Sequence, residues 1–248
     1  MPVGQSAGGG GGGSAGALGE GGAGIGGGGG AAGDLDGGTG GMPGGDAGGD
    51  VGDAGTVSVI GCADGTREGY TDLQLHPAIA ACSGAWSIPG LVAASTLTPQ
   101  CARQAGNDGA LPAGVGCSAA DLCADGWHVC LDAAELVRLS ETCAPATVLF
   151  ANDQVFFATR QHGNANGLCV AATTAGSTNS VHGCGNFGTT ELANQAATCT
   201  PLVPFRLEQP DCFNITGWVC SPAANSTTEL NDVTKTSSAH GGVLCCRD

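Results

Sequence analysis

Gly242-Val-Leu-Cys-Cys-Arg247 is the stretch that constrains the fold most, because it places two cysteines side by side. Neighbouring residues on a β-strand point to opposite faces of the sheet. A disulfide between adjacent cysteines is strained, so we expect Cys245 and Cys246 to bond different partners. The segment is therefore predicted to be a central strand that is tied to the domain on both faces. The alternative is a strained vicinal disulfide that acts as a redox switch.

The other cysteines support a disulfide framework. All 14 cysteines follow Thr56, their number is even, and no Cys-x-x-Cys spacing of a zinc ribbon or thioredoxin occurs. Up to seven disulfides, each typically contributing about 2–4 kcal/mol, indicate an oxidising compartment outside the cytosol. The predicted disulfide cysteines are Cys62, Cys82, Cys101, Cys117, Cys123, Cys130, Cys143, Cys169, Cys184, Cys199, Cys212, Cys220, Cys245 and Cys246.

The segment Met1–Gly55 differs sharply in composition from the rest of the chain. It holds 28 of the 47 glycines, no cysteine, and only scattered apolar residues. Such a segment cannot bury enough surface to offset the entropy of ordering, so residues 1–55 are predicted to be a disordered Gly-rich leash. A glycine-rich coil of this length would span roughly 40 Å. It is either a spacer that lifts the domain 56–248 off a cell envelope or a dispensable tail.

The net charge of the chain excludes some classes of binding partner. The formal charge is −15 at pH 7 and no basic cluster occurs, which argues against binding to nucleic acid or to anionic lipid headgroups. No apolar run approaches the roughly 20 residues that span a bilayer, so we expect a protein that is not membrane-spanning. No signal peptide is visible after Met1. We expect a signal or lipid-attachment segment upstream, and an extracellular or cell-envelope, lipoprotein-like location.

The clearest local unit is Gly126–Leu139. Trp127 to Cys130 suits a short strand, and Asp132 is a natural N-cap with Glu135 as its capping-box partner. A helix of two to three turns is predicted to follow, with Cys143 fastening its end. His128 within the strand is interpreted as a packed or hydrogen-bonded histidine rather than a ligand.

Other elements are weaker. Short strands and one or two helices with long cysteine-pinned loops predict an α+β domain. The expected elements are an opening strand at 57–60, a helix after Thr71, a hairpin of 148–150 with 154–159, and strands near 168–172, 205–207, 218–220 and 243–247.

Two of these stretches carry a resemblance to a known family. Leu122-Cys-Ala-Asp-Gly-Trp-His-Val-Cys-Leu-Asp-Ala-Ala-Glu-Leu136 resembles the GWH-x-P-(T/S)-x-A-E-(W/L) unit of bacterial C-type-lectin-like domains, including surface-repeat modules and the formylglycine-generating enzyme group. Gly241–Asp248 resembles their closing strand. Cys130 replaces the proline of the unit. The resemblance implies a disulfide-rich C-type-lectin-like domain, α+β, in which a strand leads into the first helix.

The same resemblance suggests a calcium site. Glu208-Gln-Pro-Asp211 matches the lectin tripeptide (E/Q)-P-(N/D), and Asn231-Asp232 follows where such lectins place W-N-D, with Leu230 replacing the tryptophan. Gln209, Asp211, Asn231 and Asp232 are thus the candidate ligand-binding residues. Asp211, Asn231 and Asp232 are the candidate metal ligands, with calcium as the cation. The alternative is that both stretches are ordinary turns.

No catalytic motif stands out. Gly-x-Ser-x-Gly is absent, and paired cysteines leave no thiolate. Asp121 and Asp125 are close enough in sequence to form an acid pair, as in a two-carboxylate glycosidase. We therefore expect an exported, non-catalytic cell-surface module that binds carbohydrate or a protein ligand. The alternatives are a secreted hydrolase acting on polysaccharide and a purely structural envelope protein.

Overall fold

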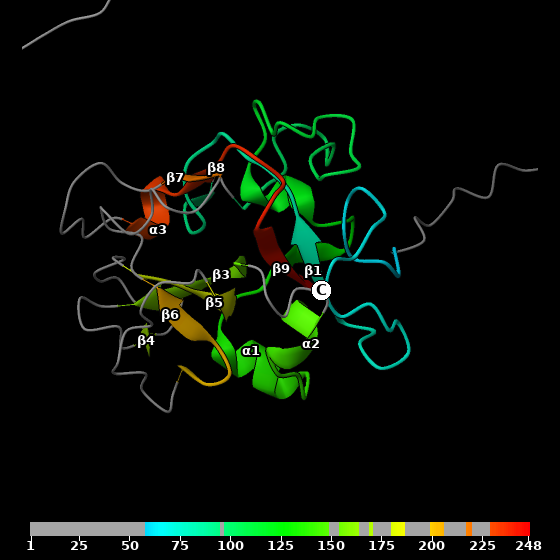
Figure 1. Cartoon of the computed structure of the whole chain (residues 1–248), viewed down its shortest axis with the longest axis vertical. Helices are drawn as coiled ribbons and strands as arrows, with labels where there is room; N and C mark the ends of the chain where they lie inside the picture. Colours follow the sequence, from blue (N-terminus) through cyan, green and yellow to red (C-terminus); the bar gives the residue numbers. More distant parts are fainter. Residues whose placement is uncertain are drawn as a thin grey trace, which may run out of the picture. The chain divides into compact units, whose positions relative to one another are not determined.

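The computed structural model describes residues 58–94, 97–148, 154–163, 169–170, 180–186, 199–205, 217–219 and 229–248. All of them belong to the compact unit Gly52–Asp248, and the predicted leash 1–55 lies outside the described ranges. Within these ranges the chain forms a mixed, sheet-rich domain with short helices and six disulfides (Figure 1). This agrees with the predicted disulfide-rich α+β class at that level of detail.

One sheet of seven strands organises the described residues, in the order β1-β9-β3-β5-β6. The strands are β1 (Ile79–Ser83), β2 (Trp127–Val129), β3 (Val155–Gly163), β4 (Cys169–Val170), β5 (Ser180–Asn186), β6 (Val203–Phe205) and β9 (Gly241–Arg247). Strand β9 pairs along one edge with β1 and along the other with β3 and then β2. Only the pairing of β3 with β9 is parallel. The predicted central position of β9 is confirmed.

Strand β9 begins with two glycines because its first residues are squeezed between β3 and β1. A Cβ atom at Gly241, whose φ is +94°, would lie 2.1 Å from the carbonyl oxygen of Phe156. A Cβ atom at Gly242 would lie 2.1 Å from the carbonyl oxygen of Cys82. Any side chain at either position would push the neighbouring strands apart, so Gly241-Gly242 is what allows β9 to occupy the centre of the sheet.

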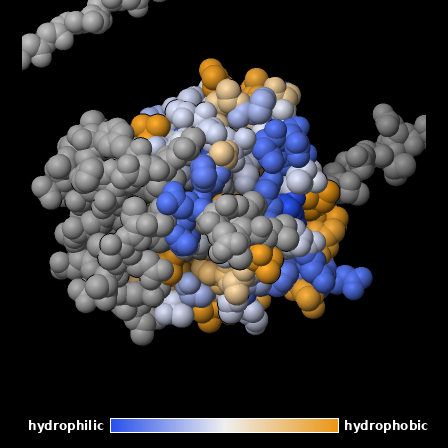
Figure 2. Space-filling view, in the orientation of Figure 1, coloured by the Kyte–Doolittle hydropathy of each residue, from blue (hydrophilic) through white to orange (hydrophobic). Residues whose placement is uncertain are grey.

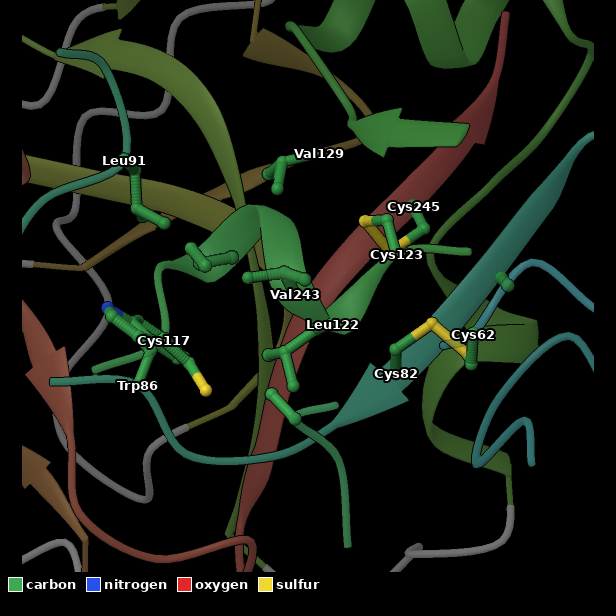
Figure 3. Packing of buried hydrophobic residues seen from close by; sticks show 14 of the residues in the cluster. Cys62, Cys82, Trp86, Leu91, Cys117, Leu122, Cys123, Val129, Val243 and Cys245 are labelled. Atoms are coloured by element: carbon green, nitrogen blue, oxygen red, sulfur yellow. A yellow bond between two sulfur atoms is a disulfide. The ribbon is translucent and has the colours of Figure 1, made fainter. Parts of the chain in front are cut away.

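The sheet separates two hydrophobic cores, and successive residues of β9 alternate between them. Val243 and Cys245 belong to the first core, with Trp86 and Leu122 (Figure 3). Trp127 belongs to the same core. Leu244 and Cys246 belong to the second core, with Tyr70, Leu136 and Phe157. Helices α1 (Ala133–Arg138) and α2 (Ala144–Thr147) lie on this second side, because Leu136 and Ala146 pack there. The single strand β9 therefore contributes to both cores at once.

Six disulfides connect the described cysteines. They are Cys62–Cys82, Cys101–Cys117, Cys123–Cys245, Cys130–Cys246, Cys143–Cys184 and Cys169–Cys199. The expectation that Cys245 and Cys246 bond different partners is confirmed, and the alternative vicinal disulfide is wrong. Figure 3 shows Cys123 meeting Cys245 in the first core. Cys212 and Cys220 lie outside the described residues.

A small second sheet closes the first core. Strands β7 (Trp218–Val219) and β8 (Thr234–Lys235) pair with each other, and Trp86 forms a bridge to Lys235. The fully buried Lys235 donates from Nζ to the carbonyl oxygens of Ser237 and Ala239. Its Nζ lies 5.5 Å from the ring centroid of Trp218. The ammonium group thus shapes the turn that leads from β8 into β9.

The helices are short. They are the 3-10 helix η2 (Ala119–Leu122) and the α-helices α1 (Ala133–Arg138), α2 (Ala144–Thr147) and α3 (Glu229–Asp232). None of these has the length and apolar character that crossing a membrane requires. The predicted N-cap is confirmed, because the Asp132 side chain accepts from the backbone N–H of Glu135.

Three details of this unit differ from expectation. Helix α1 has six residues rather than two to three turns. Its end is not fastened by Cys143, which instead precedes α2 and bonds Cys184 on β5. The Glu135 carboxylate accepts from the N–H of Leu131, at 2.6 Å, so Glu135 does not complete the expected capping box at Asp132.

Two expected elements near the start of the domain are wrong. Ser58–Ile60 forms a bend, because the carbonyls of Val59 and Ile60 accept from the Arg67 guanidinium instead of from a strand. Thr71 leads into turns, because Asp72 Oδ1 accepts from two N–H groups two and three residues later, and strand β1 then begins at Ile79.

The remaining expected strands have mixed outcomes. Strands occur close to the expected places at β4, β6, β7 and β9. In the expected hairpin, Val148 has helical dihedral angles and follows the last turn of α2, while residues 149–153 lie outside the described ranges. Strand β3 pairs with β4, β5 and β9.

We expect the two disulfides of β9 to stabilise the domain cooperatively. Each disulfide alone closes a long loop, of 122 residues for Cys123–Cys245 and 116 residues for Cys130–Cys246. When one of them is already formed, the other closes only a short ring through residues 123–130 and 245–246. Chain entropy gives about 5 kcal/mol for the long loop and about 2.6 kcal/mol for the short one. Replacing both pairs by alanine should therefore cost about 2 kcal/mol more than the two single replacements together.

Urea unfolding of the oxidised variants measures this coupling, and additive losses would contradict it. The matched control is Cys101–Cys117, whose partners are 16 residues apart in a separate loop. Its replacement should add independently to the loss of either β9 disulfide.

Candidate functional site

Two of the four residues predicted to bind a ligand are described. Asn231 and Asp232 are the last residues of α3; Asn231 is exposed and Asp232 is half-buried. Helix α3 is held in place by its buried Leu230, whose carbonyl oxygen accepts from the N–H of Leu91 at 2.8 Å. Gln209 and Asp211 lie outside the described residues, so the convergence of the four side chains stays a prediction.

A second polar group joins two loops that are far apart in sequence. Asp64 accepts at Oδ1 from the N–H of Thr66, at 3.1 Å, and at Oδ2 from the N–H of Asp108, at 3.3 Å. The Thr66 hydroxyl donates to Asp108 Oδ2 at 3.0 Å. These bonds connect the loop after Cys62 to the loop closed by Cys101–Cys117. Sequence reasoning missed this group, and the Asp64-x-Thr66 spacing is its only local signal.

Glu68 extends this group toward the sheet. Its Oε2 accepts from the N–H of Ser83 at 2.7 Å. Burial, with a smaller contribution from the charge of Asp64, raises the pKa of Glu68 to about 7. Burial also raises the pKa of Asp64, with a smaller contribution from Asp108. The three carboxyl groups therefore include one that holds its proton near neutral pH and can donate a hydrogen bond.

Beside Thr66 the surface forms a hollow of about 240 Å³ that is open to solvent. It is lined by Ile60, Gly65, Thr66, Arg67, Thr71 and Leu73. Its volume is below the roughly 300–1,000 Å³ of drug-sized ligand pockets, so it suits a small group such as one sugar ring. Aliphatic side chains and two hydroxyls on its wall offer apolar contact together with hydrogen bonds.

The buried Arg67 fixes the shape of this hollow. Its guanidinium donates to the carbonyl oxygens of Tyr70, His76 and Val59, at 3.0, 2.8 and 2.8 Å, and also to that of Ile60. The same group lies 5.5 Å from the ring centroid of Trp127. Because one side chain holds the backbone on both sides of the hollow, the wall is organised before any ligand arrives.

The described residues offer no ready metal centre of the histidine, cysteine or carboxylate kind. Two groups bring such ligand atoms within 4.8 Å of one another: Cys101, Cys117 and Asp121, and Cys130, Glu135 and Cys246. In both groups the sulfur atoms are joined in disulfides, so no thiolate is present to bind a cation.

Asp121 and Asp125 do not form the acid pair considered from the sequence. The Asp121 carboxylate is buried and accepts from the N–H groups of Gln100, Cys101, Arg103 and Ser118, and from the Ser118 hydroxyl. These backbone bonds outweigh burial and lower the pKa of Asp121. Asp125 is 92 % exposed and approaches Arg103. Asp121 thus organises a loop and leaves no oxygen for a substrate.

No family model matches the chain, and no solved structure matches it. The assignment to C-type-lectin-like domains therefore remains a proposal based on the residues of β2, α1 and β9.

We expect Glu68→Gln to stabilise the domain above neutral pH. The folded-state pKa of Glu68 is about 7, above its ordinary 4.5, so the folded state holds the proton between these values and loses stability as pH rises through that window. Glutamine keeps an acceptor for the Ser83 N–H without the charge. Urea unfolding should show a gain of about 1–3 kcal/mol at pH 8 and little change at pH 4. A loss of stability at pH 8 would contradict this account.

We expect Asp121→Asn to destabilise the domain by about 2–4 kcal/mol, because it places an NH₂ donor against N–H donors in a buried site. Asp125→Asn is the matched control and should change the free energy of unfolding by less than about 0.5 kcal/mol. The depressed pKa of Asp121 means that its contribution is present above pH 4 and is lost as pH falls through the folded-state value. Equal effects of the two substitutions would refute the structural role of Asp121.

Proposed function

We propose that this chain is an exported, non-catalytic binding module for carbohydrate, held away from a cell envelope by its Gly-rich segment 1–55. The hollow beside Thr66 carries the proposal, because it joins apolar contact to hydroxyl groups at a preorganised wall. The exposed Asp108, which accepts from the Thr66 hydroxyl, supplies a further acceptor for a sugar hydroxyl next to the hollow.

The disulfide framework supports export. Six disulfides in one domain are typical of proteins that fold in an oxidising environment. Cross-linked loops also suit a binding role, because less conformational entropy is lost when a ligand orders them.

The lectin-like resemblance supports the same function. Trp127 and His128 lie on β2, which leads through the Asp132 N-cap into α1, and β2 pairs with β9. A strand leading into the first helix, next to the closing strand, is the arrangement that the resemblance implies. The family assignment belongs to this proposal, and the calcium site at Asp211, Asn231 and Asp232 is its alternative location for the ligand.

The surface agrees better with a sugar than with a large protein partner. Among the coloured residues in Figure 2, hydrophobic residues are scattered among hydrophilic ones and do not form one broad patch. Protein partners more often require a contiguous apolar area of several hundred Å². Exposed aliphatic residues around the hollow, such as Leu73, fit the apolar face of one sugar ring.

A glycan array probed with the disulfide-bonded full chain tests the proposal, with calcium and with chelator. Leu73 lines the hollow, and Leu75 is 71 % exposed and does not. We expect Leu73→Ser to weaken glycan binding about tenfold, whereas Leu75→Ser, the matched control, leaves it unchanged. Thr71→Val should weaken binding about fivefold by removing one hydroxyl.

The other outcomes are distinct. Binding lost with chelator and with Asp211→Ala and Asp232→Ala would place the ligand at a calcium site near α3 and would contradict the hollow as the sugar site. Turnover of a polysaccharide panel would establish the alternative hydrolase. An array without binding, together with no turnover, would overturn the proposed function and leave a structural envelope protein.

A further inference from the structure

His128 lies between two carboxylates that come from different parts of the fold. Its Nε2 is 3.2 Å from Oε1 of Glu135 on α1. Its Nδ1 is 2.5 Å from Oδ1 of Asp248, the residue after β9. The imidazole side chain is 29 % exposed, and the side chains of Glu135 and Asp248 are 3 % and 62 % exposed. Both ring nitrogens are therefore directed at carboxylate oxygens.

This arrangement requires two protons on the ring. A neutral imidazole has one N–H donor and one lone pair, and a carboxylate only accepts. In a neutral His128 one ring nitrogen would present its lone pair to a carboxylate oxygen, which is repulsive. Only the imidazolium form donates to Glu135 and Asp248 together.

We propose that His128 is a proton-operated clamp that holds the end of β9 against α1 and releases Asp248 when the ring loses one proton. In the protonated form, Nε2–H donates to Glu135 and Nδ1–H donates to Asp248. In the neutral form the ring keeps the proton on Nε2, and Nδ1 no longer binds Asp248.

Glu135 and Asp248 differ in the cost of losing their hydrogen bond to His128. Glu135 is buried and also accepts from the N–H of Leu131, at 2.6 Å, and from Arg138, at 3.0 Å. Without the hydrogen bond from His128, the buried Glu135 carboxylate would lose one of the donors that offset its desolvation. Asp248 is mostly in solvent, so water can replace the imidazole at little cost. The Asp248 contact is therefore the one that opens.

The release is confined to the last residues of the strand. Cys246 pairs with His128 across the β2–β9 ladder and is bonded to Cys130. This disulfide keeps β9 in the sheet at every pH. Beyond it, the N–H of Arg247 donates to the carbonyl of Ala78 at 3.0 Å, and the N–H of Asp248 donates to the carbonyl of Gly126 at 3.1 Å. The bond made by Asp248 itself is the contact that the clamp protects.

Other charged groups around the clamp are few among the described residues. Arg138 on α1 and Arg160 on β3 both act on Glu135. Arg247 pairs with Trp127 and so belongs to the opposite face of the ladder from His128. The cations near Glu135 help to keep it ionised, so it remains an acceptor throughout the titration of His128.

The electrostatics agree in direction. The hydrogen bond to Glu135 is the largest effect on the pKa of His128 and raises it above its ordinary 6.5. Burial lowers this pKa, and the hydrogen bond to Asp248 raises it again, so the net shift is upward. A raised folded-state pKa means that the stabilisation is complete below pH 6.5 and is lost as pH rises through the folded-state value. The clamp is thus closed in acid and open in alkali.

Long-range ¹H–¹⁵N spectra of the histidine rings in the oxidised full chain, recorded from pH 5 to pH 9, test the clamp. His128→Gln identifies the signal, and His76 and His240 serve as internal references. We expect His128 to titrate above 6.5 and to become the Nε2–H tautomer. Amide exchange of Asp248, corrected for intrinsic rates, should become about fivefold faster across that titration, as expected for one lost hydrogen bond.

Two variants separate the contacts. Asp248→Asn changes an exposed side chain and should lower the pKa of His128 while removing the pH dependence of the amide exchange. Glu135→Gln should lower the same pKa further. A wild-type His128 that titrates at or below 6.5, a neutral ring protonated on Nδ1, or an Asp248 amide whose protection does not follow the titration would overturn the proposal.

Discussion

The disulfides at Cys245 and Cys246 fix one strand to two cores at once, and the architecture depends on this constraint. Cys245 bonds Cys123 on one face of the sheet, and Cys246 bonds Cys130 on the other. The chain has only ten aromatic residues, so each core buries a modest apolar area. Covalent links that restrict the unfolded chain compensate for this small area. Strand β9 could not rotate or slip by one residue without breaking both links.

Buried polar side chains give order to loops that lack regular secondary structure. The Arg67 guanidinium collects carbonyl oxygens, the Asp121 carboxylate collects N–H groups, and the Lys235 ammonium binds two carbonyls of one turn. Each group satisfies backbone atoms that would otherwise be buried without a partner. These hydrogen bonds fix the backbone around the hollow beside Thr66 and around the carboxyl groups of Asp64, Glu68 and Asp108.

The sequence predicted the features that are local or that follow from strand geometry. The alternation of Cys245 and Cys246 and the Asp132 N-cap depend on neighbouring residues, and both are confirmed. The alternating side chains of residues 57–60 predict a strand, but the carbonyls of Val59 and Ile60 accept from Arg67 instead.

The candidate site was harder to predict for the same reason. Asp64 and Asp108 meet through bonds between loops 44 residues apart, which no local pattern encodes. Half of the predicted ligand set, Asn231 and Asp232, lies together on α3 because the two residues are adjacent in sequence. Whether Gln209 and Asp211 join them depends on long-range packing that sequence spacing does not determine.

Lys235 is the only lysine of the chain, and it is fully buried. The folded domain therefore presents no lysine side chain to acylating reagents, amine cross-linkers or a lysine-specific endoprotease. Any of these can reach Lys235 only when the turn after β8 opens and Trp218 moves away from the ammonium group. The extent of lysine acylation, or of cleavage after residue 235, thus counts the molecules that have opened, and the protein carries a built-in reporter of its own unfolding.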